Sequence, residues 1–385
     1  MSLETVISIS ILGILSYFIW RLNNTRSTPK SRGGAAKKNS NRKRSLISEQ
    51  DNQDHITEAI NSDIAARCEF ELPGDFLEFT LLLSDNLDAK QQKTVQSITE
   101  SFRKPHPLLL PLIQGGFEPN ELFDLIKTDA EMTVKILNAV NSPLFSLRQP
   151  ITNIHHAIIF LGITQVKNIA TQLAVQKDLH LTDKAQNAAY KKLWTASYLA
   201  SAFGLILAKE MNEENSAELS THCLLSYLGD LAILSYRPSI ADVYLEGYGL
   251  FERTKAFQNI IGVNSAVLGK RLAQQWKLPQ SIEKGIEHSL LPLTDITGDT
   301  AITSEELRQV FVCYIACRLA DVVAFDGLRN MSESKELSFE AMGKVEFYYT
   351  QDIIKSAGLD KINTLITDIN FRKKINKVIE QTYRL

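Results

Sequence analysis

Residues 122–175 read LFDLIKTDAEMTVKILNAVNSPLFSLRQPITNIHHAIIFLGITQVKNIATQLAV, and their apolar residues recur at helical spacing. The apolar positions form two successive stripes: Leu122, Phe123 and Ile126, followed by Met132, Val134, Ile136, Leu137 and Val140. Asn141-Ser142-Pro143 should end the second helix, since Asn tolerates the left-handed conformation and Pro cannot continue the hydrogen-bond ladder. The stretch therefore predicts short packed helices with sharp stops.

Further helix starts and ends are predicted along the chain. Thr152 is expected to cap the next helix, which Gly162 ends, and Thr164 is expected to cap the one after it. From about residue 54 the pattern stays helical, with no internal repeat and no convincing strand hairpin. We predict an all-α fold, a multi-helix bundle of 44% apolar residues that can bury a substantial core.

The same stretch resembles the opening half of an HDOD domain, the bacterial HD-related output domain. The residues that carry the resemblance are Asp129, Asn141, Ser142, Ile151, Ala157, Ile158, Leu161 and Gly162. It continues through LWTASYLASAFGLILAK, LLSYLGDLAIL, GVNSAVLGKRLAQQWKLP and IEKGIEHS, and so covers residues 105–297. The resemblance implies an HDOD-type bundle whose second half is related to HD domains.

Metal-dependent HD phosphohydrolases and HD-GYP phosphodiesterases take their ligands from L-W-x-H-S, L-L-H-D-I-G, G-x-x-H and a late H-H. The matching positions here are Ala196, Ser226-Tyr227 and Ser265, and of the last pair only His288 remains. A catalytic metal needs about three protein ligands and an open water position. The resemblance therefore implies a degenerate site with no metal, no cofactor and no catalytic residue.

Neighbouring residues could in principle replace the missing ligands. THCLLSYLGDLAIL, residues 221–234, reads as one buried helix holding His222, Cys223 and Asp230. His222 with His288 makes only two ligands, and Asp230 is expected on the wrong side of Gly229. His155 and His156 point about 100° apart on a helix, which prevents joint coordination.

The four cysteines, Cys68, Cys223, Cys313 and Cys317, are too scattered for a disulfide framework, and they indicate a reducing compartment. Cys313 and Cys317 lie one helical turn apart. We expect small core residues there, with a zinc half-site or a redox pair as the alternative. No Ser/His/Asp or Cys/His constellation stands out along the chain.

The N-terminal segment is predicted to be a membrane anchor. Residues 3–20 would span roughly 27 Å as a helix, slightly less than the ~30 Å hydrocarbon core. A secretory signal peptide fits less well, because Glu4 stands where a basic n-region is expected and no small-x-small cleavage site follows. Nine Lys or Arg and no acid in residues 21–48 place the body in the cytoplasm by the positive-inside rule. The expected location is a single pass through the inner membrane.

The remaining regions differ sharply in charge. Residues 21–53 should be a disordered linker, whose basic part 21–44 could attract anionic lipid. From residue 45 the chain has 33 Lys and Arg against 43 Asp and Glu, a formal charge of −10, which argues against nucleic-acid binding. We expect helical segments at 54–104 and 298–385 on either side of the HDOD-like region.

These observations predict a non-catalytic signal-transduction module that binds an unidentified signalling protein, or a ligand, at the cytoplasmic face of the membrane. Two alternatives remain: a metal-dependent HD-type phosphohydrolase or cyclic-dinucleotide phosphodiesterase with relocated ligands, and a nucleotide sensor that does not hydrolyse.

Overall fold

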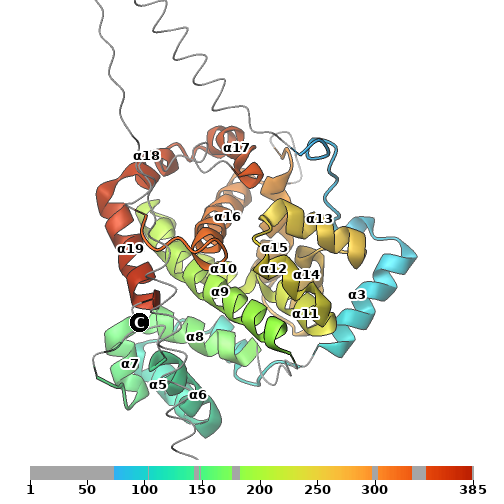
Figure 1. The fold of residues 1–385 in the computed structure, drawn as a ribbon. Helices are drawn as coiled ribbons and strands as arrows, with labels where there is room; N and C mark the ends of the chain where they lie inside the picture. Colours follow the sequence, from blue (N-terminus) through green and yellow to red (C-terminus); the bar gives the residue numbers. More distant parts are fainter. Residues whose placement is uncertain are drawn as a thin grey trace, which may run out of the picture. The chain divides into compact units, whose positions relative to one another are not determined.

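The structure is a computed structural model that describes residues 73–102, 104–142, 147, 149–175, 183–296, 302–331 and 344–383. These residues belong to one compact unit, Asn61–Leu385, and they are helical with no strand among them, as the sequence predicts (Figure 1). The predicted anchor at 3–20 and the linker at 21–53 lie outside the described residues. Within the described part, no helix is both long and apolar enough to cross a bilayer.

The helices follow one another in a fixed order, with short 3-10 turns (η) between some of them. They are η1 Ser84–Asn86, α3 Ala89–Ser101, α4 Leu109–Gln114, α5 Pro119–Lys127, α6 Ala130–Val140, α7 Ile154–Leu161, α8 Ile163–Val175, α9 Lys184–Glu210, α10 Ser216–Leu225, α11 Leu228–Tyr236, η3 Pro238–Ile240, α12 Ala241–Leu245, α13 Leu250–Ile260, α14 Ser265–Gln275, α15 Gln280–Glu287, η4 His288–Leu293, α16 Ser304–Ala324, η5 Val345–Phe347, α17 Thr350–Ala357, α18 Lys361–Thr367 and α19 Ile369–Tyr383.

Helices α4 to α8 pack together as one group, in which α8 contacts α4, α5, α6 and α7. The predicted apolar stripes supply its core, with Leu122 and Ile126 of α5 and Met132, Ile136 and Val140 of α6 buried. Val134 was expected in the same core, but its side chain is 56% exposed. It lies on the face of α6 opposite the one that packs on its neighbours, so the predicted stripe was one residue too wide.

Asn141 ends α6 without adopting the left-handed conformation that the sequence suggested. Its φ is −85° and its ψ is 1°. Its side chain instead binds the backbone of Ile151, with Nδ2 donating to the carbonyl oxygen at 2.7 Å and Oδ1 accepting from the N–H at 2.7 Å. The Asn141 side chain therefore holds the chain that returns after α6, which is a tertiary contact and not a local turn.

The helix starts in this region also differ in detail from the prediction. Asn153, and not Thr152, caps α7, since its side chain accepts from the His156 N–H at 2.8 Å. Helix α8 already begins at Ile163, so Thr164 lies within its first turn. Gly162 ends α7 as predicted, with a φ of 86° that favours glycine.

Other residues of the HDOD-like pattern have structural roles. Asp129 caps α6 by accepting from the Met132 N–H at 2.8 Å and pairs with His106 Nε2 at 2.9 Å. The Ser142 hydroxyl donates to the Ala139 carbonyl oxygen at 2.6 Å. In α7, Ala157 is fully buried and Leu161 is partly buried against the core.

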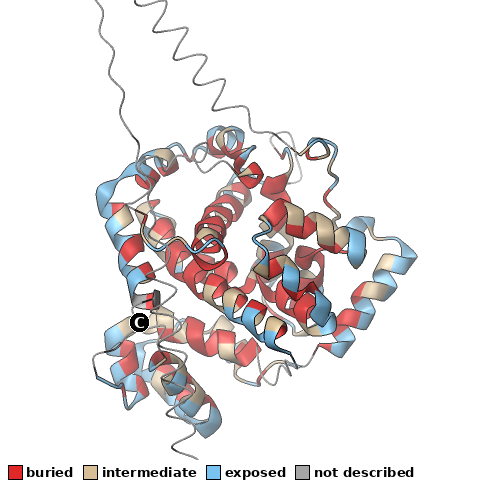
Figure 2. Ribbon diagram, viewed as in Figure 1, coloured by how far each residue is buried: buried red, intermediate tan, exposed pale blue. Residues whose placement is uncertain are grey.

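Helix α9 organises the second half of the unit. It packs on α16 and α10, and also contacts α8, α11, α12 and α19. Figure 2 shows α9 and α16 buried over most of their length, and α16 has buried residues on every face. A helix that is buried all round has to bury its polar side chains as well, so Arg318 and Asp321 of α16 need partners inside the protein.

The stretch 221–234 is not one helix, as was expected, but two. Helix α10 ends at Leu225, and α11 begins at Leu228 after a break at Ser226 and Tyr227. Beyond the break, Gly229 packs directly on the first turn of α14. A Cβ atom on Gly229 would lie 1.8 Å from the Ser265 carbonyl oxygen, so only glycine fits there. Residues on both sides of the break are buried, from Leu219 to Leu225 in α10 and from Leu228 to Leu234 in α11.

Candidate functional site

A small cavity of about 20 Å³ lies where α11, α13, α14, η4 and α16 meet. It is lined by Ser226, Tyr227, Asp230, Leu250, Arg253, Ser265, Ser289, Leu290, Cys313, Tyr314, Cys317 and Arg318. The structure thus brings together Ser226, Tyr227 and Ser265, three of the positions where the HD resemblance places metal ligands. It does not bring Ala196 or His288 to the same cavity. Ala196 is fully buried in α9, and His288 lines a different cavity.

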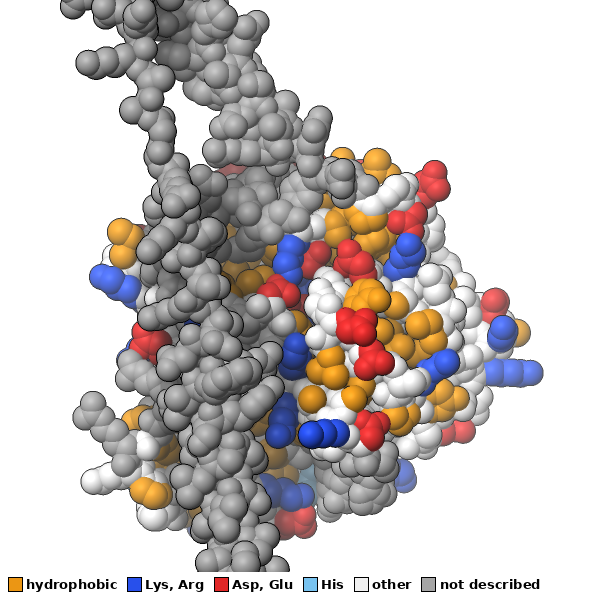
Figure 3. Space-filling view, viewed as in Figure 1, with side chains coloured by type: hydrophobic (Ala, Val, Ile, Leu, Met, Phe, Trp, Pro, Cys, Tyr) orange, Lys and Arg blue, Asp and Glu red, His pale blue; other side chains and the backbone are white. Residues whose placement is uncertain are grey.

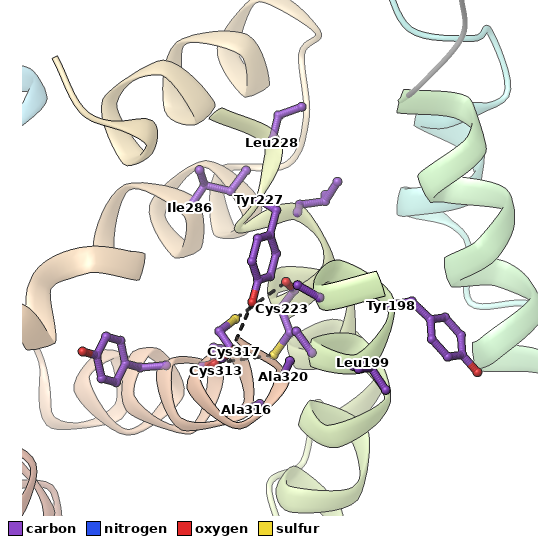
Figure 4. Close-up of a cluster of buried hydrophobic side chains, with 14 of the residues drawn as sticks. Tyr198, Leu199, Cys223, Tyr227, Leu228, Ile286, Cys313, Ala316, Cys317 and Ala320 are labelled. Carbon is purple, nitrogen blue, oxygen red and sulfur yellow. Dashed lines mark hydrogen bonds between the residues drawn. The ribbon is translucent and has the colours of Figure 1, made fainter. Parts of the chain in front are cut away.

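Tyr227 takes much of the space at the break between α10 and α11. Its ring is buried and points towards α16, where the side chains of Cys313 and Cys317 lie (Figure 4). The hydroxyl group donates to Asp321 Oδ1 at 2.8 Å and lies 3.1 Å from the Cys317 carbonyl oxygen. Burial, and then the Asp321 carboxylate, raise the pKa of the phenol, so Tyr227 is a neutral hydrogen-bond donor.

Two buried arginines share the Asp321 carboxylate with Tyr227. Arg253 Nη2 lies 2.6 Å from Asp321 Oδ2, and Arg318 Nη2 lies 3.2 Å from the same oxygen. Burial opposes ionisation of the carboxyl group, but Arg318 and Arg253 outweigh it and lower the pKa of Asp321. The guanidinium groups also rest on aromatic rings, Arg253 4.6 Å from the Phe325 centroid and Arg318 5.1 Å from the Tyr314 centroid.

Asp230 lines this cavity and not the one that His222 and His288 line, in keeping with the expectation that it cannot join those two histidines as a third ligand. The Tyr244 hydroxyl donates to Asp230 Oδ1 at 3.0 Å. Burial raises the pKa of Asp230, with Arg253 and Tyr244 acting in the opposite direction.

The residues around the cavity do not fit a divalent metal. Serine and tyrosine hydroxyls stand at the ligand positions, while imidazole and carboxylate are the usual catalytic ligands. The carboxylate of Asp321 is already bound by two guanidinium groups, whose positive charges would repel a metal cation. No group of three or more His, Cys, Asp or Glu side chains that could hold a metal occurs among the residues that the structure describes.

A larger cavity, of about 260 Å³, lies between α10, α15 and α16. His222, Gly285, His288, Glu306 and Cys313 are among the residues that line it. The two histidines considered as replacement ligands therefore do reach one cavity, although they lie 66 positions apart in the sequence.

In this cavity His222 lies beside the thiol of Cys313. Burial disfavours the imidazolium, but the neighbouring Cys313 and Glu218 outweigh it and raise the pKa of His222 to about 9. The Cys223 thiol and the imidazolium lower the pKa of Cys313, against the effect of burial. Sequence reasoning missed this Cys–His pair, since residues from α10 and α16 meet only in the folded chain and no spacing indicates it.

Comparisons with known proteins match part of the chain to one family. Residues 112–291 match the model of the HDOD domain family. A curated relative from Treponema pallidum, an uncharacterized protein, is 27% identical over 184 residues, which are 45% of this chain and 34% of that protein. The match thus spans about a third of the relative's length.

Several solved structures of low sequence identity resemble the chain. One, from Marinobacter aquaeolei and provisionally named a signal transduction protein, is 14% identical, with 77% of this chain and 67% of that chain covered and a TM-score of 0.49. Another, from Shewanella amazonensis and provisionally named a phosphohydrolase, is 16% identical, with coverage of 74% and 97% and a TM-score of 0.45.

Proposed function

Since residues 112–291 of this chain are an HDOD domain, we propose that the protein is a signal-transduction module that acts by binding a partner and not by metal-dependent hydrolysis. The observation that carries the proposal is the pair of guanidinium groups, Arg253 and Arg318, around Asp321 at the cavity where three of the ligand positions implied by the HD resemblance meet. In this proposal the two guanidinium groups take the place of the metal cation, and the side chains of Tyr227, Arg253 and Arg318 are buried as part of the protein core.

The size of the cavity bears on the nucleotide-sensor alternative. Arg253 Nε and Arg318 Nε and Nη1 are buried and have no hydrogen-bond partner in the described residues, which favours an anion or a water molecule nearby. The space of about 20 Å³, however, holds roughly one water molecule, whereas small-molecule sites usually exceed about 300 Å³. We therefore favour a protein partner over a nucleotide.

The relocated-ligand phosphohydrolase is the alternative that the fold itself permits. His222 and His288 both reach the larger cavity, so this cavity is where such an enzyme would have to bind its metal. The pKa of His288 is lowered, mainly by burial, so its ring is available as a neutral ligand. Glu306 and Cys313 line the same cavity, but among the described residues no three His, Cys, Asp or Glu side chains are grouped so that they could hold the metal of a catalytic site.

Elemental analysis and hydrolysis assays on the purified full chain separate these possibilities. We expect no stoichiometric manganese, iron or zinc, and no turnover of cyclic dinucleotides or phosphomonoesters. Stoichiometric metal, with turnover abolished by His288→Ala but retained by His156→Ala, would overturn the proposal. His156 is a suitable control because it is exposed and lines neither cavity.

Restoring part of the lost motif gives a second test. The double variant Ser226→His/Tyr227→Asp should remain inactive, because Ala196 and Ser265 leave further ligand positions vacant. It should also unfold at lower urea concentration than the wild type, since it buries polar groups without partners. Metal-dependent hydrolysis by this variant would show that the arginine pair does not exclude a cation.

We also propose that the module works at the cytoplasmic face of the inner membrane, attached by residues 3–20, with anionic lipid near residues 21–44. On the face visible in Figure 3, the described residues present basic and acidic side chains side by side, which supports a protein partner rather than nucleic acid. Protease added to intact spheroplasts should spare residues 45–385, and deleting residues 1–21 should release the protein. Cleavage of the body from outside would contradict this orientation.

A further inference from the structure

Three thiols meet where α10 packs on α16. Cys223 comes from α10, and Cys313 and Cys317 come from successive turns of α16; all three are free (Figure 4). The Cys223 thiol interacts with those of both Cys313 and Cys317. The Cys317 sulfur lies 3.8 Å from the Cys223 carbonyl oxygen, so α16 and α10 are in contact at these two cysteines.

Only one of the three thiols combines a cavity with a basic partner. Cys313 lines the cavity of about 260 Å³, and its neighbour His222 lines the same cavity. His222 is 5% exposed, and its Nε2 has no hydrogen-bond partner in the described residues. The nearest anion, Glu218 Oε1, stands 3.6 Å away, which is an ion pair but too long for a hydrogen bond.

We propose that Cys313 is a peroxide-reactive thiol, oxidised through this cavity with the help of His222 and then resolved by Cys223 to a disulfide. The substrate class is hydrogen peroxide or a small organic hydroperoxide, which a cavity of this volume admits. Sensor cysteines of this kind typically lie beside a resolving cysteine, and disulfides in reducing compartments are usually transient and redox-sensing.

The chemistry takes place in two balanced steps. The Cys313 thiolate attacks one oxygen of the peroxide, so an S–O bond forms and the O–O bond breaks. The hydroxide that leaves takes a proton from the His222 imidazolium and becomes water, and the thiolate sulfur has lost two electrons to the peroxide. The Cys223 thiol then gives up its proton and its sulfur attacks the sulfenic sulfur as the thiolate, so that an S–S bond replaces the S–O bond, and the hydroxide that leaves takes up the proton and becomes water.

The charges around the cavity favour this assignment. The Cys223 thiol and the His222 imidazolium lower the pKa of Cys313 to about 6, whereas Glu213 acts to raise it. Glu218 stabilises the imidazolium, and its own pKa falls to about 2, first because of His222. Lys284 of α15 and Glu306 of α16 also line the cavity, and they neutralise each other at 2.8 Å, so they add little net charge.

The alternative is that the three thiols are only small core residues, and Cys317 fits that description. It lines the smaller cavity, and it is 4% exposed. Burial raises the pKa of Cys223, which keeps it a thiol until Cys313 has been oxidised. The three cysteines thus differ in environment, and the difference predicts different reactivities.

The test treats the reduced full chain with one equivalent of hydrogen peroxide, followed by peptide mass spectrometry with and without dimedone. We expect a Cys223–Cys313 disulfide in the wild type and a dimedone adduct on Cys313 in Cys223→Ser. Cys317→Ser should still form the disulfide. His222→Gln should slow oxidation of Cys313 roughly tenfold or more through loss of the acid, whereas His288→Gln, on the same cavity, should leave the rate unchanged.

A second measurement does not depend on the folding of the His222 variant. The rate of Cys313 alkylation by iodoacetamide in the wild type should be half-maximal near pH 6, against about 8.5 for an ordinary thiol. A midpoint near 8.5, equal oxidation of the three thiols, or an unchanged rate in a folded His222→Gln protein would each overturn the proposal.

Discussion

Replacing Asp321 by asparagine should destabilise the protein by about 3 kcal/mol, because the carboxylate is the anion that both buried arginines share. Arg253 Nη2 and Arg318 Nη2 lie 2.6 and 3.2 Å from one of its oxygens, and Tyr227 donates to the other at 2.8 Å. The side chains of the two arginines are only 4% and 6% exposed, so water cannot replace the lost charge.

The magnitude follows from the loss of one partner of a buried ion pair. Removing such a partner costs about 3–5 kcal/mol, since it leaves an uncompensated buried charge. The asparagine carbonyl oxygen can still accept from Tyr227 or from one guanidinium, which returns about 1 kcal/mol. The expected loss therefore lies at the lower end of the range.

Urea unfolding of the full chain measures this loss directly. With a slope near 3 kcal/mol/M, the midpoint of Asp321→Asn should fall by about 1 M. Asp326→Asn is a matched control, since Asp326 pairs with Lys344 and both side chains are 29% exposed, so it should cost less than about 1 kcal/mol. Adding Arg318→Met to Asp321→Asn should recover stability, because it removes one unpaired charge.

Equal midpoints for Asp321→Asn and Asp326→Asn would refute this reasoning. They would show that the Asp321 carboxylate does not stabilise the two buried guanidinium groups, and that Arg253, Arg318 and Asp321 do not form a mutually dependent charge network.

Further predictions concern packing, a tertiary contact and pH. Gly229→Ala should cost about 1–3 kcal/mol or more in urea unfolding, since the new Cβ meets a backbone oxygen, whereas Gly116→Ala, with open space around it, should change stability by under about 0.5 kcal/mol. Asn141→Val should lower the thermal midpoint by an amount equivalent to about 1–3 kcal/mol, because two hydrogen bonds to the chain after α6 are lost; an unchanged midpoint would contradict that role. Hydrogen bonds from a lysine and from the α16 N-cap lower the pKa of Glu306 to about 2, so its contribution to stability is complete above pH 4.5 and is lost as the pH falls towards 2. The stability difference between wild type and Glu306→Gln should shrink over that window, and a difference that stays constant from pH 5 to pH 2 would contradict this role.

Local features of the sequence determined the helical fold. Apolar spacing predicted the buried faces of α5 and α6, and Gly162 predicted the end of α7, because these signals act within a few residues along the chain. The resemblance to HD enzymes, and not local spacing, grouped Ser226, Tyr227 and Ser265, and these residues do line one cavity. The predicted conformation of Asn141 was wrong, because its side chain binds the backbone of a residue ten positions away.

Only the tertiary structure decided what fills the site. Arg318 and Asp321 are one helical turn apart, but Arg253 is 68 positions from Asp321, and nothing in the sequence indicates that it meets them. The break at Ser226 and Tyr227 separates α10 from α11, and α11 then packs against α14 through Gly229, a contact between residues 36 positions apart. His222 and Cys313 are 91 positions apart, so their pairing, and any chemistry it supports, exists only because α10 and α16 pack together.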